Sequence, residues 1–441
     1  MKIAIVGAGW AGLAAAVEAT QAGHQAVVFE ASHFTGGRAR AVDGRLPDGT
    51  PVTLDNGQHI LIGAYRETLR LLQRVGVDPQ TALLRQPMTL RFADASGLQF
   101  PDWPTPLDAL AGIVTARGWN WGDKWSLLSL ASRWHWQGFT CEASTSVAQL
   151  CRRLSSRVMA ELIEPLCISA LNTRPEQASA QVFLRVLKDA LFGAAGGSNL
   201  LLPRVDLSAL FPQAAARWLA GHGARLQLGA RVESILPQGS QWQVRDDCFD
   251  AVILATPASE AIRLLEKSAP ATPEAIATKI RHWTELSRAL RFEAISTVYA
   301  WAPDAVLAQP MLTLRSNLSP DAAAPAQFVF DRGQLGGPAG LLAFVVSASS
   351  AQREVLQWQV LQQAQAQLGL SLRAVQTIVE KRATFACTPG LRRPAVGIAP
   401  GLLACGDYVE GPYPATLEGA LRSATVAVKA ARLDVYDAEP G

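Results

Sequence analysis

The chain opens as strand, glycine-rich turn, helix and strand, and this order restricts the fold more than any other feature of the sequence. Residues 2–6 (KIAIV) are β-branched at three of five positions, which suits a buried parallel strand. Residues 13–22 suit a helix, and residues 25–30 (QAVVFE) suit a second strand. The order predicts a βαβ unit, in which the two strands lie parallel in one sheet.

Three glycines at the first turn of this unit form the pattern G-x-G-x-x-G. Gly7 permits the tight turn, Gly9 lets a pyrophosphate approach the backbone, and Gly12 lets helix and strand pack closely. Trp10 and Ala11 lie between them, where the N-terminus of the helix offers unpaired N–H groups to the phosphates. The pattern predicts a dinucleotide-binding site.

An acidic residue and a second glycine pair follow. Glu30, with Ala31 after it, ends the second strand 18 residues past the last glycine, where its carboxylate can accept hydrogen bonds from ribose hydroxyls. Six residues further comes GGRA, which resembles the FAD-binding signature of the amine oxidase and phytoene desaturase superfamily. There Gly37 would bring backbone close to the cofactor and Arg38 would pair with the pyrophosphate. A surface salt bridge is the alternative for Arg38.

The C-terminal part of the chain completes this resemblance. In that superfamily a late strand ends in Gly-Asp, and a helix then begins beneath the flavin ring. The matching residues are Gly406 and Asp407, followed by a helix-like stretch over 414–432. The resemblance implies that Asp407 accepts from ribityl hydroxyls and that N–H groups around Thr416 and Leu417 face the flavin. We therefore expect the two ends of the chain to meet.

Three further regions narrow the resemblance to one family. They are 54–76 (LDNGQHILIGAYRETLRLLQRVG), 164–180 (EPLCISALNTRPEQASA) with 196–212 (GGSNLLLPRVDLSALFP) after it, and 382–394 (RATFACTPGLRRP). Together with the termini these resemble hydroxysqualene dehydroxylase, also described as squalene-associated FAD-dependent desaturase. The resemblance spans nearly the whole chain. The nucleotide motifs alone identify only the superfamily.

The expected fold is α/β, with a Rossmann-type FAD-binding domain of the glutathione reductase type and an inserted α+β substrate domain. The FAD-binding domain is expected to be discontinuous, comprising 1–90, 195–265 and 380–441. The substrate domain would then be built from 91–194 and 266–379.

Further cofactor contacts are implied by the same resemblance. The turn with Gly57, Gln58 and His59 would lie beside the flavin ring, and Val232 would meet the adenine through its backbone. His59 is the candidate general acid, since histidine transfers protons near neutral pH. The alternative is that His59 only hydrogen-bonds the cofactor or braces the turn.

Three other side chains are alternatives for the acid. Asp55 would qualify only if it were buried. Glu418 lies on the helix beneath the flavin, where its side chain faces either the flavin or the opposite side of the helix. Cys387 suits a packed thiol better than a catalyst.

The reaction implied by the family is reductive removal of the hydroxyl of hydroxysqualene, which gives squalene by hydride transfer from reduced flavin. It needs an electron donor, which the sequence does not identify. The alternatives are a desaturase or isomerase of a carotenoid-like polyene, an amine oxidase, or a non-catalytic carrier of prenyl lipids.

One segment holds an unusual concentration of tryptophan. Five of the twelve tryptophans of the chain lie within 118–139. Tryptophan mixed with Lys, Arg and Leu suits a membrane interface, where the ring is half wet. The alternative is a buried helical hairpin whose rings line the pocket or the core.

Composition limits the other partners. The 441-residue chain has a net charge of +3 and no basic tract of the kind that binds nucleic acid. Six cysteines without C-x-x-C spacing favour reduced thiols in a cytosol, and we expect no metal site. No uninterrupted apolar run reaches about 18 residues, so no spanning helix is expected. The expected location is cytoplasmic, with peripheral attachment to the inner face of the cytoplasmic membrane as a further option.

Overall fold

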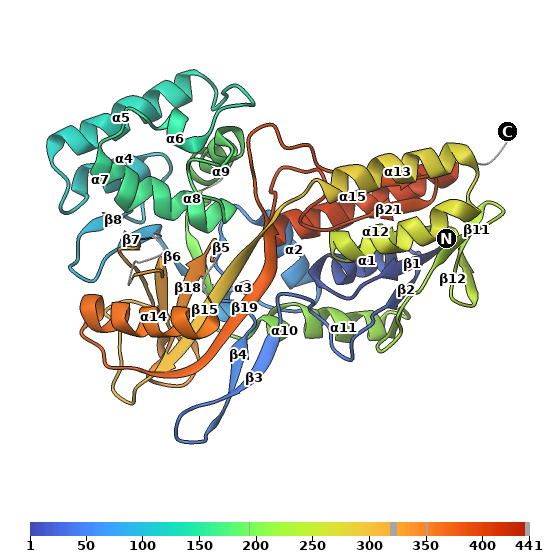
Figure 1. The fold of residues 1–441 in the computed structure, drawn as a ribbon, viewed down its shortest axis with the longest axis horizontal. Helices are drawn as coiled ribbons and strands as arrows, with labels where there is room; N and C mark the ends of the chain where they lie inside the picture. Colours follow the sequence, from blue (N-terminus) through green and yellow to red (C-terminus); the bar gives the residue numbers. More distant parts are fainter. Residues whose placement is uncertain (194, 318–323, 350–351, 437–441) are drawn as a thin grey trace.

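A six-stranded, mostly parallel sheet forms the centre of one half of the molecule (Figure 1). The computed structural model describes residues 1–193, 195–317, 324–349 and 352–436. The strand order is β10-β2-β1-β14-β21-β20, and only the edge strand β20 runs antiparallel to its neighbour. The strands are β1 (Lys2–Val6), β2 (Gln25–Phe29), β10 (Arg225–Gln227), β14 (Ala251–Leu254), β20 (Gly397–Ala399) and β21 (Leu402–Ala404).

The expected βαβ unit and the meeting of the chain ends are both present. Helix α1 (Trp10–Gln21) connects β1 to β2, and it is buried on most of its surface because it is rich in alanine. It packs against α11 (Pro212–Gly221) and α15 (Leu417–Tyr436), so the last helix of the chain lies on the first. This confirms the Rossmann-type α/β fold class.

The other face of this sheet is covered by a small meander and two helices. The meander consists of β11 (Ile235–Gln238), β12 (Gln241–Val244) and β13 (Asp247–Phe249), and the helices are α12 (Ala258–Ser268) and α13 (Glu274–Arg288). Helix α13 contacts α12 and β20. It therefore lies with the parallel sheet, although the sequence placed the start of the substrate domain at residue 266. The proposed domain division as a whole stays a prediction.

A second, antiparallel sheet lies beside the first half (Figure 1). Its order is β16-β17-β18-β15-β19, and α14 (Arg353–Leu368) packs against β15 and β19. The strands are β15 (Phe292–Trp301), β16 (Met311–Thr313), β17 (Phe328–Asp331), β18 (Leu341–Ser347) and β19 (Arg373–Phe385).

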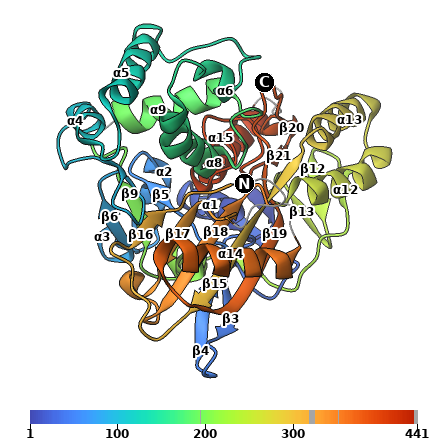
Figure 2. The same cartoon turned by 60° about the vertical axis from the view of Figure 1, so that its left-hand side comes forward.

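Helices form a third part, which we call the helical cap and define as residues 103–192 (Figure 2). Its helices are α4 (Leu107–Thr115), α5 (Trp121–Trp136), α6 (Val147–Leu150), α7 (Ser156–Val158), α8 (Glu164–Leu171) and α9 (Ala180–Phe192), with a π-helical turn over Met159–Ile163. Among the described residues, no helix is both long and apolar enough to span a bilayer.

Short helices and strand pairs connect these parts. The helices are α2 (Arg66–Arg74), α3 (Pro79–Ala82) and α10 (Leu207–Leu210). The strands are β3 (Ala41–Arg45) with β4 (Pro51–Asp55), β5 (Leu61–Ile62) and β6 (Leu83–Gln86) with β9 (Leu200–Pro203), and β7 (Thr89–Arg91) with β8 (Gly97–Gln99).

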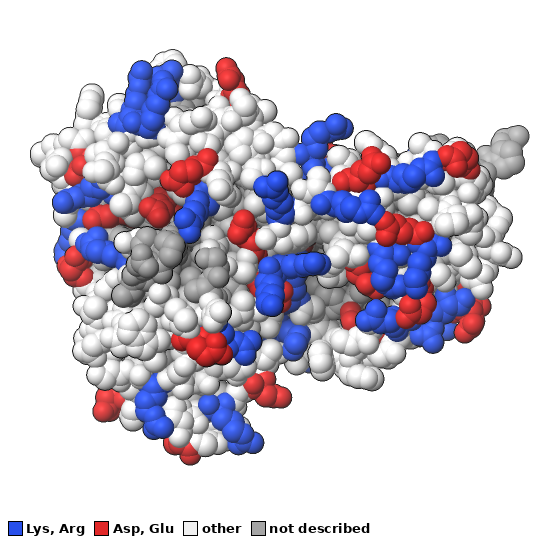
Figure 3. All heavy atoms as spheres, viewed as in Figure 1, with Lys and Arg blue, Asp and Glu red and all other residues white. Residues whose placement is uncertain are grey.

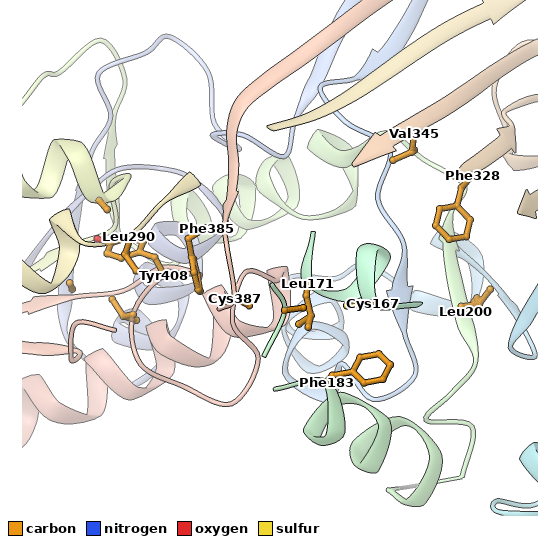
Figure 4. Close-up of a cluster of buried hydrophobic side chains, with 14 of the residues drawn as sticks. Cys167, Leu171, Phe183, Leu200, Leu290, Phe328, Val345, Phe385, Cys387 and Tyr408 are labelled. Carbon is orange, nitrogen blue, oxygen red and sulfur yellow. The ribbon is translucent and has the colours of Figure 1, made fainter. Parts of the chain in front are cut away.

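A buried apolar cluster joins the cap to both sheets. Figure 4 shows Leu171 and Phe183 of the cap with Leu200 of β9, and with Phe328 and Val345 of the antiparallel sheet. All five side chains also line the large cavity described next. The parts of the molecule are therefore packed around a shared interior space.

Candidate active site

One cavity of about 1190 Å³ runs from the parallel sheet into the helical cap. At one end it is lined by residues that follow β1, β2, β14 and β21, which is the edge where open α/β sheets bind ligands. At the other end it is lined by α4, α5, α8 and α9. Pockets for one drug-sized ligand measure about 300–1,000 Å³, so this cavity is larger than that usual range.

The structure brings nearly all of the sequence-predicted site residues to this cavity. Only Gly12 lies off its wall. The lining residues are Gly7, Gly9, Trp10, Ala11, Glu30, Ala31, Gly37, Arg38, Gly57, Gln58, His59, Val232, Gly406, Asp407, Thr416 and Leu417. Their individual roles remain predictions.

Glycine is required at the first turn for steric reasons. Gly7 has a φ of +109°, and a Cβ there would lie 2.6 Å from the carbonyl oxygen of Ala255. A Cβ on Gly12 would lie 1.9 Å from the carbonyl oxygen of Gly7, so the helix can pack here only without a side chain. Gly37 has a φ of +60°, and a Cβ there would lie 3.3 Å from the Cα of Gly9. The two glycine loops are therefore in contact.

Trp10 has a different role from its neighbours. Its ring is buried, its Nε1–H donates to the carbonyl of Ala39 at 2.8 Å, and it packs on Phe211 with ring centroids 5.1 Å apart. The side chain therefore ties the helix to the second glycine loop, and only the backbone of Trp10 can serve a ligand.

Glu30 is held at the end of β2 by backbone donors. One carboxylate oxygen accepts from the N–H of Ala8 at 2.7 Å, and the other accepts from the N–H of Ser32 at 2.8 Å. A carboxylate has about four acceptor sites, so this geometry leaves capacity for ribose hydroxyls.

Arg38 and Asp407 form an ion pair, with Nη2 2.6 Å from Oδ1. The carboxylate of Asp407 raises the pKa of the guanidinium. Arg38 also donates to the carbonyls of Arg382 and Ala383, in a part of β19 where three residues face one residue of β15. Arg38 therefore binds the glycine loop to the end of β21 and to β19. The sequence expected both ion-pair partners to contact the cofactor, and it did not predict that they contact each other.

Gln58 and Val232 are fixed by arginines of other segments. The side-chain oxygen of Gln58 accepts from Arg332 at 3.3 Å, and its backbone N–H donates to Thr297 Oγ1 at 3.4 Å. The carbonyl of Val232 accepts from Arg263 at 3.1 Å, so its N–H is the backbone group left for a ligand.

The last helix begins at Leu417, three residues later than the sequence suggested. Thr416 caps it, because its Oγ1 accepts from the N–H of Gly419 at 2.9 Å. Ala415 has a φ of +60°, and its N–H donates to the carbonyl of Asp407 at 3.1 Å. This bond closes the loop over 407–415 and brings the start of the helix close to the backbone of Asp407.

Buried polar atoms without partners mark both ends of the cavity. Within the described part of the chain, the hydroxyls of Thr256 and Tyr408 have no hydrogen-bond partner at the nucleotide end. The indole N–H of Trp134 has none at the cap end. Leaving such a group unpaired costs about 1–3 kcal/mol, which a polar ligand would recover. With the glycine loops and the helix N-terminus, these hydroxyls fit a dinucleotide such as FAD.

His59 is half-buried, and its Nδ1 lies 2.6 Å from the carbonyl oxygen of Gly57. Since a carbonyl only accepts, Nδ1 carries the proton, and Nε2 is the nitrogen that can exchange one. Burial lowers the pKa of the imidazole, and the charge of Arg38 lowers it further. The neutral form therefore dominates at pH 7.

Glu418 and Cys387 do not line the cavity. Glu418 is fully buried and faces α2, where it accepts from the N–H and the hydroxyl of Thr68 and pairs with Arg422 at 2.6 Å. Burial raises the pKa of the Cys387 thiol to about 12, which agrees with a packed thiol.

Asp55 is buried, as an acid at this position would have to be, but it does not line the cavity. Its Oδ1 accepts from the N–H of Leu207 at 2.7 Å, and Arg332 lies 3.9 Å from its Oδ2. Burial raises the pKa of this carboxyl group to about 6.

The cap end of the cavity is lined almost entirely by apolar side chains. They include Leu90, Phe100, Ile113, Leu127, Phe139, Leu162, Leu166, Phe183, Leu187, Leu191, Met311, Phe328 and Phe330. Between the two ends lies a polar pair, in which Asn172 donates to Thr384 Oγ1 at 2.9 Å.

Sequence reasoning missed several polar residues of the cavity. Tyr408 directly follows the Gly-Asp pair, so its position was a usable signal. Asn172 and Thr384 lie in two of the regions that carry the family resemblance, which gave them no role, and Glu380 lies outside those regions. All three reach the cavity through the pairing of β19 with β15 and the end of α8.

Comparison with known proteins gives concordant matches. The profile of the family described as flavin containing amine oxidoreductase matches residues 10–431. The chain is 24% identical over 451 residues to a hydroxysqualene dehydroxylase of Sinorhizobium fredii, covering 96% of both chains. It is 25% identical over 440 residues to one of Rhodopseudomonas palustris, covering 95% of both. The structure of cyclohexylamine oxidase from Brevibacterium oxydans has a TM-score of 0.68 at 16% identity, covering 99% of both chains.

Proposed function

The chain belongs to the flavin-containing amine oxidoreductase family, and on that premise we propose that it removes the hydroxyl group of hydroxysqualene reductively to give squalene. It is an FAD-dependent oxidoreductase. One observation carries the proposal: a single cavity joins a glycine-lined nucleotide end to a long apolar end. Full-length relatives that are named hydroxysqualene dehydroxylase support this choice of substrate.

The reaction requires a hydride, a proton and a dry site. Reduced FAD supplies the hydride, and a separate donor must provide the two electrons. The apolar walls of the cap hold the isoprenoid and exclude water, which would otherwise capture the carbon that loses its hydroxyl. The rings of Phe183, Phe328 and Phe330 line this end, and aromatic faces stabilise positive charge.

His59 is the proposed source of the proton that lets the hydroxyl leave as water. Its Nδ1 is occupied by Gly57, so Nε2 would deliver the proton. Only the protonated imidazole can do this, and its pKa lies below the usual 6.5. The single-turnover rate should therefore fall about tenfold per pH unit above that pKa. Bracing the turn remains the competing role of His59.

A pH series with the variant His59→Ala separates the two roles of His59. If His59 is the acid, the variant keeps its FAD, reacts ~10²-fold or more slowly and loses the pH dependence. A variant with full FAD and a near-normal rate removes His59 as the acid and leaves the family assignment standing.

The other functions make different demands on the cavity. An amine oxidase of this superfamily often uses a lysine beside the flavin, and no lysine lines the cavity in the described part of the chain. A desaturase or isomerase of a carotenoid-like polyene would use the same apolar end, but a desaturase needs oxidised FAD and an electron acceptor. A carrier of prenyl lipids would bind without turnover.

Anaerobic turnover tests the proposal. We expect the FAD-loaded protein, photoreduced without oxygen, to convert hydroxysqualene to squalene, which mass spectrometry would detect as the flavin reoxidises. Binding of hydroxysqualene without squalene formation would favour a carrier. Turnover of a polyene with oxidised FAD would favour the desaturase.

We also propose that segment 118–139 contacts a membrane surface. The structure divides its tryptophans between the interior and the surface. Trp119 and Trp134 are buried, whereas Trp121, Trp125 and Trp136 are 73%, 71% and 87% exposed. Only the three exposed rings are available to lipid.

A further inference from the structure

Exposed apolar side chains gather on the helical cap. Elsewhere in the described chain they are scattered, and no helix or strand carries more than two, which are Val355 and Trp358 on α14. On the cap they come from α4, α5, the turn before α4 and the end of α9. We call this group the cap patch and define it as Trp103, Leu107, Leu110, Val114, Trp121, Trp125, Trp136 and Phe192.

Most of the exposed charges around the cap patch are positive. Along α4, α5 and the turn between them the acidic residues are Asp108 and Asp123, and both are buried. Arg117 and Arg133 are exposed, and Lys124 is partly exposed, with its Nζ 5.3 Å from the centre of the Trp121 ring. Asp102, next to Trp103, is an exposed carboxylate at the edge of the patch, and the patch otherwise presents tryptophans and cations to its surroundings.

Other faces of the molecule differ. In Figure 3, blue and red side chains alternate closely over α12 and α13 on the right, while the region over α4 and α5 at the upper left is mostly white. Arg263, Lys267, Arg281 and Arg288 of α12 and α13 are all ion-paired with glutamates. The cap patch is therefore a distinct surface.

The cap patch is continuous with the cavity. Leu110, Trp136 and Phe192 are exposed to solvent and also line the cavity wall. The ring of Phe192 lies 5.0 Å from that of Phe139, which is buried and lines the same cavity. A path of apolar side chains thus leads from the outer surface to the substrate end of the site.

We propose that the cap patch docks on an anionic lipid bilayer, and that Leu110, Trp136 and Phe192 frame a portal through which the substrate passes between lipid and cavity without entering water. The substrate class rests on the proposed function; the docking rests on the patch itself. Tryptophan is favoured at the headgroup level of a bilayer, and exposed Lys and Arg are attracted to anionic lipids. If a second copy of this chain covered the patch with its own patch, the cations of the two copies would face and repel each other. Anionic lipid is therefore the better occupant.

Vesicle binding by the FAD-loaded protein tests the docking. The probes are vesicles of phosphatidylcholine with and without phosphatidylglycerol, and binding should be stronger with the anionic lipid and weaker in high salt. Changing Trp121 and Trp125 to Ser should weaken binding about tenfold or more, with the melting temperature unchanged. The matched control is Trp358→Ser, which alters a 59% exposed ring on α14, outside the patch.

Three results would overturn the docking. They are wild-type protein that does not bind anionic vesicles, a double variant that binds as well as wild type, and a wild-type dimer that the double variant converts to monomer. The last result would assign the patch to a second copy.

Turnover of membrane-borne substrate tests the portal. Leu110→Asp places a charge at the mouth, so it should slow turnover of hydroxysqualene in vesicles at least tenfold while vesicle binding persists. Equal turnover by wild type and Leu110→Asp in vesicles would overturn the portal. If wild type binds vesicles but converts no hydroxysqualene in vesicles or detergent, the proposed function fails and the docking stands.

Discussion

The two ends of the cavity are built on different physical principles. At the nucleotide end, backbone groups form most of the site. Glycines leave room for close backbone contacts, and two backbone N–H groups hold the carboxylate of Glu30. At the cap end, apolar side chains from several helices and several strands form the wall. The backbone geometry of the nucleotide end allows few residue types, and only at fixed spacing in the sequence. An apolar wall can be formed by many different apolar residues at many positions.

This difference predicts how each end responds to change. At the nucleotide end a single methyl group collides with backbone that cannot move. At the cap end the cost of a substitution depends on whether the side chain is buried, which sequence spacing does not reveal.

The largest effect should come from the first glycine turn. In Gly12→Ala the new Cβ would lie 1.9 Å from the Gly7 carbonyl oxygen, so helix α1 and the turn cannot both keep their positions. We expect little or no bound FAD and a large loss of thermal stability, measured by flavin absorbance per chain and by melting temperature. The matched control Gly221→Ala, also in a helix, meets nothing within 4 Å and should stay within about 1 kcal/mol of wild type.

Similar behaviour of the two glycine variants would break the comparison. A Gly12→Ala protein that holds a full complement of FAD would show that the turn can adjust, and that backbone geometry does not dictate the motif.

The next effect contrasts two neighbouring tryptophans in the cap. Trp119 is 6% exposed and its Nε1–H donates to Glu161 at 2.9 Å, whereas Trp121 is 73% exposed. Trp119→Ala should lower the free energy of unfolding by about 3–5 kcal/mol, and Trp121→Ala by about 0.5 kcal/mol or less. Denaturant unfolding of both variants measures the difference. Equal losses of unfolding free energy would mean that the exposure of a cap side chain does not determine its contribution to stability.

The same contrast explains what the sequence could predict. The βαβ unit followed from spacing, because Gly7, Gly9 and Gly12 are needed wherever a turn of this kind exists. The FAD cofactor and the meeting of the chain ends followed from the resemblance of the second glycine pair and of the C-terminal Gly-Asp to a known superfamily. The partners of Arg38 did not follow, because Asp407 lies 369 residues away and β19 is bulged where it meets Arg38.

The cap shows the limit more clearly. Five tryptophans in one segment indicated a special surface, but not which rings face outward. Trp119 precedes α5 and turns inward to Glu161, 42 residues later, whereas Trp121 begins the helix and faces out. That distinction depends on tertiary contacts, and no local pattern encodes it.

The smallest effect concerns pH and again separates the two halves. Burial raises the pKa of Asp55 from 3.8 to about 6 in the folded protein. Between these values the folded chain binds a proton that the unfolded chain does not, so stability falls as pH rises from about 4 to 6. Roughly two pKa units correspond to about 3 kcal/mol.

Asp55→Asn removes this titration and keeps an oxygen for the N–H of Leu207. The stability of Asp55→Asn relative to wild type should therefore improve by about 3 kcal/mol between pH 4 and 7, as measured by denaturant unfolding at several pH values. Leu127→Ala, at a buried apolar position of the cap, should instead lose a constant amount at every pH. A constant offset for Asp55→Asn as well would show that Arg332, 3.9 Å away, keeps the carboxylate charged in the folded protein. The buried charge of Asp55 would then carry no pH-dependent cost, and the contrast with the cap would rest on sterics alone.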